Sequence, residues 1–232
     1  MTSPRERLIV ALDVSSSAEA QKLVTALGDS VQTYKVGMQL YTAVGPPVVR
    51  DLVASGRNVF LDLKYHDIPN TIAAAVREAA QLRVSMLTVH ASGGTNMLRA
   101  ATDASREINP ELKILAVTVL TSLNENELHE TGVPGRLEDQ VLRLASAALN
   151  SGCAGVVSSA HEVSCLRAKL GKDFLAVTPG VRPAGAAHAD QARVVTPAEA
   201  IAAGATHIVV GRPITAAASP LRALEEVLKD IA

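Results

Sequence analysis

The chain has 232 residues, with 22 basic and 23 acidic side chains and a formal net charge of −1. A charge balance this even leaves no basic footprint for nucleic acid or for an anionic membrane. Hydrophobic residues make up 48% of the chain, enough to build a sizeable core and to exclude general disorder. Aromatic residues make up only 2%, so base-stacking surfaces and aromatic carbohydrate clefts are not expected, and the core must consist of Ala, Val, Leu and Ile.

The sequence carries no signal for export or for a membrane. Cys153 and Cys165 are too few for a disulfide framework or a cysteine-rich metal site. The first apolar run reaches Asp13 too soon for a signal peptide, and the longest uncharged stretch, 144–161, is interrupted by Asn and Gly. We therefore expect a soluble, cytoplasmic protein with neither a membrane nor a nucleic acid as its partner.

Short apolar runs rich in β-forming residues recur along the whole chain. Near-continuous apolar runs of this length are typical of strands that are buried on both faces, as in parallel sheets. The eight runs begin at Leu8, Thr33, Asn58, Met86, Lys113, Gly155, Phe174 and His207.

The segments between these runs carry helix signals, and three of them open on a proline, which suits the first turn of a helix. Helices are predicted at 18–29, 69–82, 96–108, 137–150, 161–170, 197–203 and 220–231. Repeated β-then-α units in a chain of this length predict a single (β/α)8 TIM barrel of the α/β class over residues 1–232. An open doubly wound sheet is the competing fold, but it usually has fewer strands and often a glycine-rich turn after the first strand, where this chain reads Asp-Val-Ser-Ser-Ser.

One loop is unusual in composition. The segment 183–191 is rich in Ala and Gly and carries no acidic or basic side chain before Asp190, apart from His188. It is either an ordinary surface connection or a mobile lid, because small residues permit closure over a ligand.

Charged residues gather where the predicted strands end, which is the active-site face of a barrel. Asp62 and Lys64 lie two apart on one run, so strand geometry points both to the same face. A structural salt bridge could account for one such pair, but less readily for a whole set converging on one rim. An alternating acid–base array could instead keep Lys64 protonated beside a reacting carbon. The set comprises Asp13, Lys35, Asp62, Lys64 and Asp67.

A phosphate site is indicated separately by the segments after the seventh and eighth runs. Barrels often bind phosphate with these two loops. They contain Gly180, Arg182, Gly211 and Arg212. Glycine lets backbone N–H groups approach an anion, and arginine supplies a bidentate fork.

The remaining histidines and cysteines give weaker signals. His90 stands at a strand end near acidic neighbours, where a hydrogen-bonded structural role is favoured over metal binding. His66 and the other histidines are scattered, and no metal-binding cluster stands out. The two cysteines lack a nearby activating partner and are interpreted as packing or surface residues.

The string from Asp62 to Thr71, Asp-Leu-Lys-Tyr-His-Asp-Ile-Pro-Asn-Thr, closely resembles the signature of the orotidine 5'-monophosphate decarboxylase family. Further motifs agree in register along the whole chain, and the likeness is to the bacterial, monofunctional form. These motifs are Ala11-Leu12-Asp13, Tyr34-Lys35-Val36-Gly37, Leu120-Thr121-Ser122, Thr178-Pro179-Gly180-Val181-Arg182, Gln191 and Gly211-Arg212-Pro213-Ile214.

The resemblance implies a decarboxylase that needs no cofactor and acts on orotidine 5'-monophosphate in the last step of UMP synthesis. Lys64 would donate a proton to C6 of the pyrimidine, and Asp62 would lie near the substrate carboxylate and hold Lys64. Asp13 and Lys35 would contact the ribose hydroxyls, with Lys35 also linked to the charged array.

The resemblance also implies a homodimer with shared active sites. Asp67, as a catalytic residue, and Thr71 would reach into the site of the partner subunit. Ser122 and the backbone of Thr121 would read the edge of the pyrimidine.

The resemblance further implies a set of residues that binds the phosphate of the substrate, and the loop at 183–191 would then be the loop that closes on this phosphate. This group comprises Gln191, Gly211 and Arg212, with Arg182 beside them.

Two alternatives stay open at this point. Sugar-phosphate decarboxylases and aldolases of the same suprafamily share an Asp-x-Lys-x-x-Asp motif, but they use Mg²⁺ and could employ His90 in catalysis. The Ile68-Pro69-Asn70-Thr71 continuation argues against them. The second alternative is a non-catalytic barrel that binds a nucleotide as a regulator.

Overall fold

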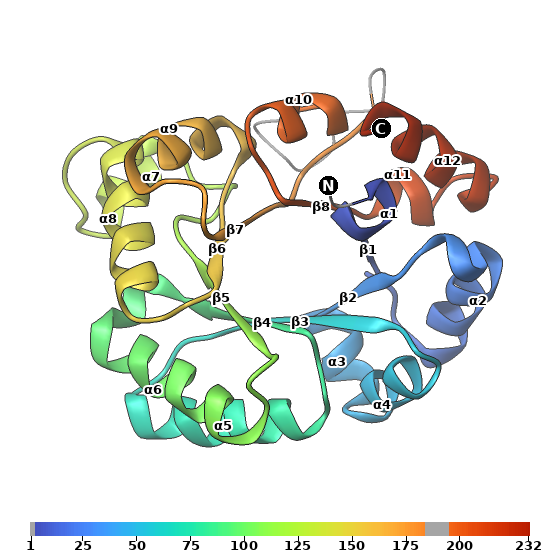
Figure 1. Ribbon diagram of the computed structural model, residues 1–232, viewed down its shortest axis with the longest axis horizontal. Coiled ribbons are helices and arrows are strands. Elements are labelled where there is room, and N and C mark those ends of the chain that lie inside the picture. Colours follow the sequence, from blue (N-terminus) through green and yellow to red (C-terminus); the bar gives the residue numbers. More distant parts are fainter. Residues whose placement is uncertain (1–2, 184–194) are drawn as a thin grey trace.

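The computed structural model describes residues 3–183 and 195–232. Within these ranges, eight parallel strands close into a barrel in chain order, and β1 pairs with both β2 and β8 (Figure 1). This confirms the predicted (β/α)8 barrel over the open sheet. The strands are Leu8–Ala11 (β1), Thr33–Gly37 (β2), Asn58–Tyr65 (β3), Met86–His90 (β4), Lys113–Val117 (β5), Gly155–Val157 (β6), Leu175–Thr178 (β7) and His207–Val210 (β8).

Helices surround the barrel (Figure 1). The predicted ones are confirmed to within three residues at each end: Ser17–Leu27 (α2), Pro69–Gln81 (α5), Gly94–Ile108 (α6), Leu137–Asn150 (α8), Ala160–Leu170 (α9), Pro197–Ala202 (α10) and Pro220–Asp230 (α12). Short helices that the sequence analysis missed are Pro4–Arg7 (α1), Met38–Val44 (α3), Pro47–Ala54 (α4), Glu125–Glu130 (α7) and Arg212–Thr215 (α11).

The missed helices α3 and α4 have a local cause. Gly45 ends α3 with a positive φ of 69°, and two prolines follow it directly. A segment that could have formed one amphipathic helix is thereby divided into helices of seven and eight residues. Neither is long enough to show a clear helical periodicity in the sequence.

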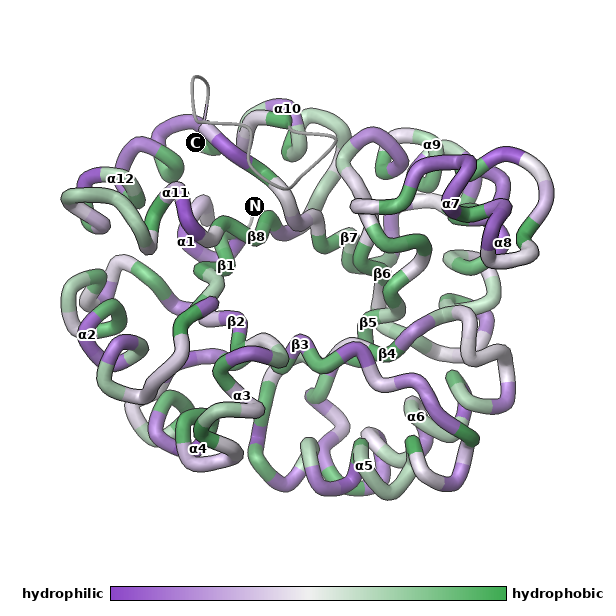
Figure 2. The backbone as a smooth tube through the Cα atoms, turned by 180° about the vertical axis from the view of Figure 1, so that it is seen from behind, coloured by the Kyte–Doolittle hydropathy of each residue, from purple (hydrophilic) through white to green (hydrophobic). Residues whose placement is uncertain are grey.

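Side chains on most of the strands alternate between two apolar layers. On β1, Ile9 and Ala11 join a small inner cluster with Phe60 and Val209, whereas Leu8 and Val10 join the large outer cluster. The inner cluster fills the barrel and the outer one packs strands against helices, as parallel strands buried on both faces require. In Figure 2 the tube is mostly green along β6 and β7, whereas the helices alternate between green and purple.

Strand β3 departs from regular pairing near its end. Leu61 pairs with Leu87 and Tyr65 with Val89, so four steps along β3 match only two along β4. Lys64, in this irregular stretch, has a φ of 51°. Strict two-residue alternation, from which the sequence analysis placed Asp62 and Lys64 on one face, therefore does not describe this stretch. A bulge re-aims side chains at the rim of a barrel.

Two further features bear on the expectations for membranes and thiols. Among the described residues, no helix is both long and apolar enough to cross a bilayer. Both cysteines are free; Cys165 lies exposed on α9, whereas Cys153 is buried. This burial raises the pKa of the Cys153 thiol to about 12, so the thiol stays protonated at neutral pH and packs like an apolar side chain.

Candidate active site

A cavity of about 580 Å³ opens at the carboxyl ends of the strands. This volume is typical of a pocket for a small molecule. Part of its apolar lining comes from the inner cluster of the barrel, through Ala11, Phe60, Val157 and Val209. The charged groups of the cavity therefore adjoin a buried apolar layer, and electrostatic interactions are stronger beside such a layer than in water.

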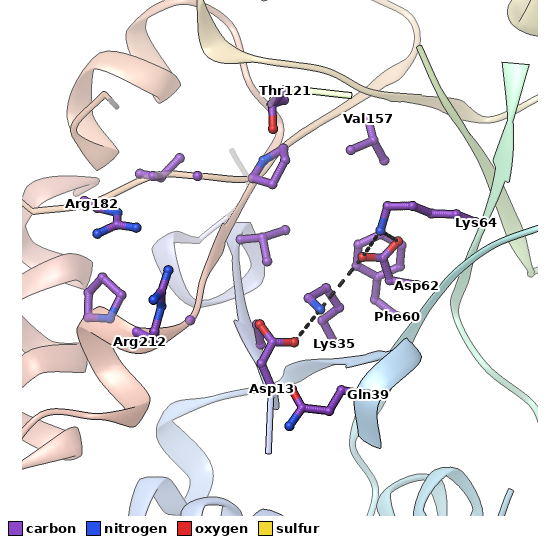
Figure 3. A pocket seen from close by; sticks show the side chains of 17 residues that line it. Asp13, Lys35, Gln39, Phe60, Asp62, Lys64, Thr121, Val157, Arg182 and Arg212 are labelled. Atoms are coloured by element: carbon purple, nitrogen blue, oxygen red, sulfur yellow. Dashed lines mark hydrogen bonds and ion pairs between the residues drawn. The ribbon is translucent and has the colours of Figure 1, made fainter. Parts of the chain in front are cut away.

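Four charged side chains form a row of alternating sign along this cavity (Figure 3). Lys35 Nζ lies 2.8 Å from Asp13 Oδ1 and 3.8 Å from Asp62 Oδ2. Lys64 Nζ lies 2.9 Å from each carboxylate oxygen of Asp62. The side chains of Lys35 and Asp62 are only 12% and 13% exposed, so each charge depends on its neighbours of opposite sign.

Gly37 gives this row the space that it needs. A Cβ atom at Gly37 would lie 2.8 Å from Lys35 Nζ and 3.4 Å from Asp13 Oδ1. The φ of Gly37 is −94°, which any residue adopts, so the glycine is needed there for space and not for its backbone conformation. The Tyr34-Lys35-Val36-Gly37 motif thus carries both the lysine and the room for its ion pair.

The opposite wall of the cavity carries two arginines. Arg182 follows β7 and Arg212 follows β8, and Figure 3 shows both across the cavity from Asp62 and Lys64. The backbone N–H of Arg182 donates to the carbonyl of Val195 at 3.0 Å, which ties together the two ends of the intervening segment. Gly180 and Gly211 also line this wall, as the sequence analysis predicted for a phosphate site.

The predicted phosphate-binding loop and Gln191 lie almost entirely outside the part of the chain that the structure describes. Residues 184–194, which hold nearly all of the predicted lid and Gln191, lie outside the described residues.

The expectation that five charged residues meet on one rim holds for four of them. Asp67 does not line the cavity of its own chain, and its carboxylate accepts the backbone N–H of Ile68 at 2.7 Å. Thr71, in the first turn of α5, is exposed and also lies outside the cavity lining. Thr121 lines the cavity, whereas its neighbour Ser122 is exposed and does not.

His90 and His66 lie together beside the charged row. Their ring centroids are 5.4 Å apart. The pKa of His90 is lowered from its ordinary value, first by burial and then by the nearby His66 and Lys64, against the opposing effect of Asp62. His90 is therefore neutral at physiological pH. The sequence analysis treated His66 as a scattered residue and missed this contact.

Gln39 is a lining residue that the sequence analysis also missed. It lies in the first turn of α3, two residues after Gly37, and its Nε2 donates to Ser15 Oγ at 2.9 Å. Its position just beyond the β2 motif was the available signal, since residues that directly follow a barrel strand lie on the same rim.

The fold and this cavity define a class of protein: a (β/α)8-barrel enzyme in which carboxylates hold a lysine opposite a wall that carries two arginines. The family model described as "Orotidine 5'-phosphate decarboxylase / HUMPS family" matches residues 6–227. The chain therefore belongs to this family, and it is a carboxy-lyase.

Individual relatives agree over nearly their full lengths. An orotidine 5'-phosphate decarboxylase of Afipia carboxidovorans is 52% identical, with 100% of this chain and 97% of the relative covered. One of Heliobacterium modesticaldum is 47% identical, with 98% and 96% covered. The crystal structure of orotidine 5'-phosphate decarboxylase from Lactobacillus acidophilus superposes with a TM-score of 0.87 at 41% identity, covering 97% of this chain and 98% of the other.

The role of Gly37 can be tested by adding one methyl group. We expect Gly37→Ala to lower the free energy of unfolding by about 1 kcal/mol or less, because the Cβ meets only the far end of the Lys35 side chain, which shifts at the cost of its ion pair with Asp13. Urea unfolding would measure this cost. In a Lys35→Met background, which lacks the amine, the added cost of Gly37→Ala should largely disappear; an equal cost in both backgrounds would contradict the explanation.

Proposed function

We propose that the protein decarboxylates orotidine 5'-monophosphate to uridine 5'-monophosphate in the cytoplasm, without a cofactor, and that Lys64 is the proton donor. The observation that carries the proposal is the position of Lys64 Nζ, which lies 2.9 Å from both oxygens of Asp62 at the wall of the cavity. The family membership of the chain and the motifs on β1, β2 and β3 support it.

The chemistry needs a cation at one carbon atom. Breaking the bond from C6 to the carboxylate releases carbon dioxide and leaves the electron pair on C6, where no adjacent carbonyl can delocalise it as an enolate. The Lys64 ammonium stabilises this charge as it develops and then donates a proton to C6, which leaves a neutral amine that solvent reprotonates. Asp62 pairs with the ammonium and holds it in place before the reaction, and Lys35 pairs with the same carboxylate.

The two arginines suit the other end of the substrate. Arg182 and Arg212 stand across the cavity from Lys64, so a phosphate bound there would place the pyrimidine toward the charged row. Binding energy from a group remote from C6 can be used to hold the reacting end in a dehydrated, strained arrangement. In this arrangement Asp13 and Lys35 contact the ribose hydroxyls, and Thr121 contacts the pyrimidine. Ser122, which lies outside the cavity lining, reaches the pyrimidine only if its segment moves toward the bound substrate.

A second copy of the chain completes the site in this proposal. Asp67 and Thr71 are exposed and lie outside the cavity of their own chain. Ile68 between them is 68% exposed, and contact with a second copy of the chain would remove this apolar surface from water. We infer that this segment packs on the partner subunit and delivers Asp67 and Thr71 to the partner's cavity.

The reaction and its proton donor can be tested together. We expect ultraviolet absorbance to report conversion of orotidine 5'-monophosphate, with EDTA leaving the rate unchanged. Lys64→Ala should lower kcat by at least about a thousandfold, because both the proton donor and the cation are lost.

The control is Lys113→Ala, which removes an exposed lysine at the start of β5 and should retain the wild-type rate. Full turnover by Lys64→Ala would contradict the proton-donor role. Loss of activity with EDTA would favour the Mg²⁺-dependent sugar-phosphate enzymes, and tight nucleotide binding without release of carbon dioxide would favour a regulator.

The phosphate role of Arg212 predicts a selective loss of affinity. Arg212→Ala should weaken inhibition by uridine 5'-monophosphate by about ten- to a hundredfold and leave inhibition by uridine unchanged, because a charge-assisted contact to phosphate is lost. Competitive inhibition constants measure both. Arg222→Ala, at an exposed position on α12, is the matched control. Equal losses for nucleotide and nucleoside would contradict the assignment.

The shared site predicts complementation between two inactive variants. Asp67→Ala and Lys64→Ala each disable their sites, but a hybrid dimer holds one site with both residues intact. Random exchange in an equal mixture should restore about a quarter of the wild-type activity, because half of the dimers are hybrids and each has one working site. No recovery after exchange is demonstrated, for example by mass spectrometry, would exclude a shared site.

A further inference from the structure

The buried hydroxyl group of Thr88 contacts both members of the Asp62–Lys64 ion pair. Thr88 Oγ1 donates to Asp62 Oδ1 at 3.0 Å and accepts the backbone N–H of Lys64 at 2.9 Å. The same Asp62 Oδ1 also accepts from Lys64 Nζ at 2.9 Å. Thr88 therefore contacts the carboxylate and the lysine backbone at once, and its single proton and one of its lone pairs are both in use.

The irregular pairing of β3 explains why a side chain is needed there. Between the Leu61–Leu87 and Tyr65–Val89 pairs, β3 has three residues, whereas β4 has only one, Thr88. Lys64 has a φ of 51°, and Arg83 is the other non-glycine residue with a positive φ in the described part of the chain. The Thr88 hydroxyl supplies a partner to a backbone N–H in a bulge, where regular pairing is interrupted.

Thr88 has no access to a ligand in the cavity. Its residue is 0% exposed, and it is not part of the cavity lining. Alternation along β4 puts Leu87 and Val89 in the outer cluster and Met86 in the inner one, so Thr88 points into the barrel below the charged row. Any effect of Thr88 on the reaction must therefore pass through Asp62 and Lys64.

We propose that Thr88 is a positioning residue for the decarboxylation: its hydroxyl orients the Asp62 carboxylate and fixes the bulged backbone of Lys64, so that Lys64 Nζ faces C6 of the substrate. This inference rests on the proposed function. The hydroxyl restrains the rotation of a carboxylate that both lysines share. It also restrains the backbone from which the Lys64 side chain extends.

The role predicts a loss in kcat with little change in KM. Thr88→Val keeps the shape of the side chain and removes the hydroxyl, so kcat should fall by about ten- to a hundredfold, the effect expected for one hydrogen bond to a charged group. KM should stay within about threefold, because Thr88 touches none of the residues proposed to hold the phosphate or ribose, as far as the described hydrogen bonds extend. Thr88→Ser retains the hydroxyl and should recover kcat to within about threefold of wild type.

A matched control separates positioning from general stability. Thr102 on α6 is 2% exposed, and its Oγ1 donates to the carbonyl of Ser151 at 2.9 Å, outside the barrel. Thr102→Val removes a buried hydroxyl of the same kind and should lower Tm without changing kcat. If Thr88→Val does not fold, Thr88→Ala replaces it in the comparison with Thr88→Ser.

The outcomes distinguish this inference from the proposed function. An active wild type with unchanged kcat in Thr88→Val overturns the role of Thr88 alone. Equal losses in Thr88→Val and Thr88→Ser also overturn it, because the hydroxyl would then not be the cause, and so does a matching loss of kcat in Thr102→Val. No conversion by the wild-type protein overturns the proposed function, and the role of Thr88 with it.

Discussion

The ion pairing of Lys35 and Lys64 with the shared carboxylate of Asp62 is the interaction on which the rest of the site depends. A cation at the wall of a partly buried cavity is costly unless opposite charge lies beside it, and here one carboxylate serves two lysines within 4 Å. The surrounding structure accommodates this arrangement: Gly37 leaves room for the Lys35 amine, and the inner cluster of the barrel supplies a buried apolar layer beside it. Two neighbouring strands, β2 and β3, bring the lysines together, so the charge row depends on the register of the barrel and not on a flexible loop.

The fold could be predicted from the sequence because its signals are local and repeated. Each apolar run is long enough to mark a strand, and a parallel barrel buries both faces of every strand, so the runs need no finer pattern. The prediction failed where local signals are brief: α3 and α4 are separated by Gly45 and two prolines, and neither helix completes enough turns to be recognised. The strand ends were placed well enough to bring four of the charged residues together on one rim, which is why most of the site could be anticipated.

What the sequence could not predict depends on backbone geometry and on contacts between strands. Two-residue alternation correctly put Asp62 and Lys64 at the same cavity, but it could not predict that their contact is made across a bulge with Lys64 at a positive φ. Thr88 gave no signal, because a threonine inside an apolar run is an ordinary strand residue and only the register with β3 gives its hydroxyl two partners. The contact between His66 and His90 was missed for the same reason, since it joins the ends of two different elements. For Asp67 the sequence predicted a contact that a single chain does not make. Its motif placed it with the other charges, but within one chain its carboxylate accepts the next backbone N–H.

The bulge at Lys64 also explains how the site can be both strained and fixed. A non-glycine residue at positive φ costs about 1–2 kcal/mol, and such conformations persist only where surrounding contacts determine them. At Lys64 those contacts are the Thr88 hydroxyl on the backbone and the Asp62 carboxylate on the amine. The Thr88 hydroxyl and the Asp62 carboxylate are hydrogen-bonded to each other, so backbone, carboxylate and ammonium belong to one closed hydrogen-bonded unit. In the mechanism proposed above, such a unit would need little reorganisation when charge develops at C6, and preorganised charge of this kind is a main source of transition-state stabilisation in enzymes.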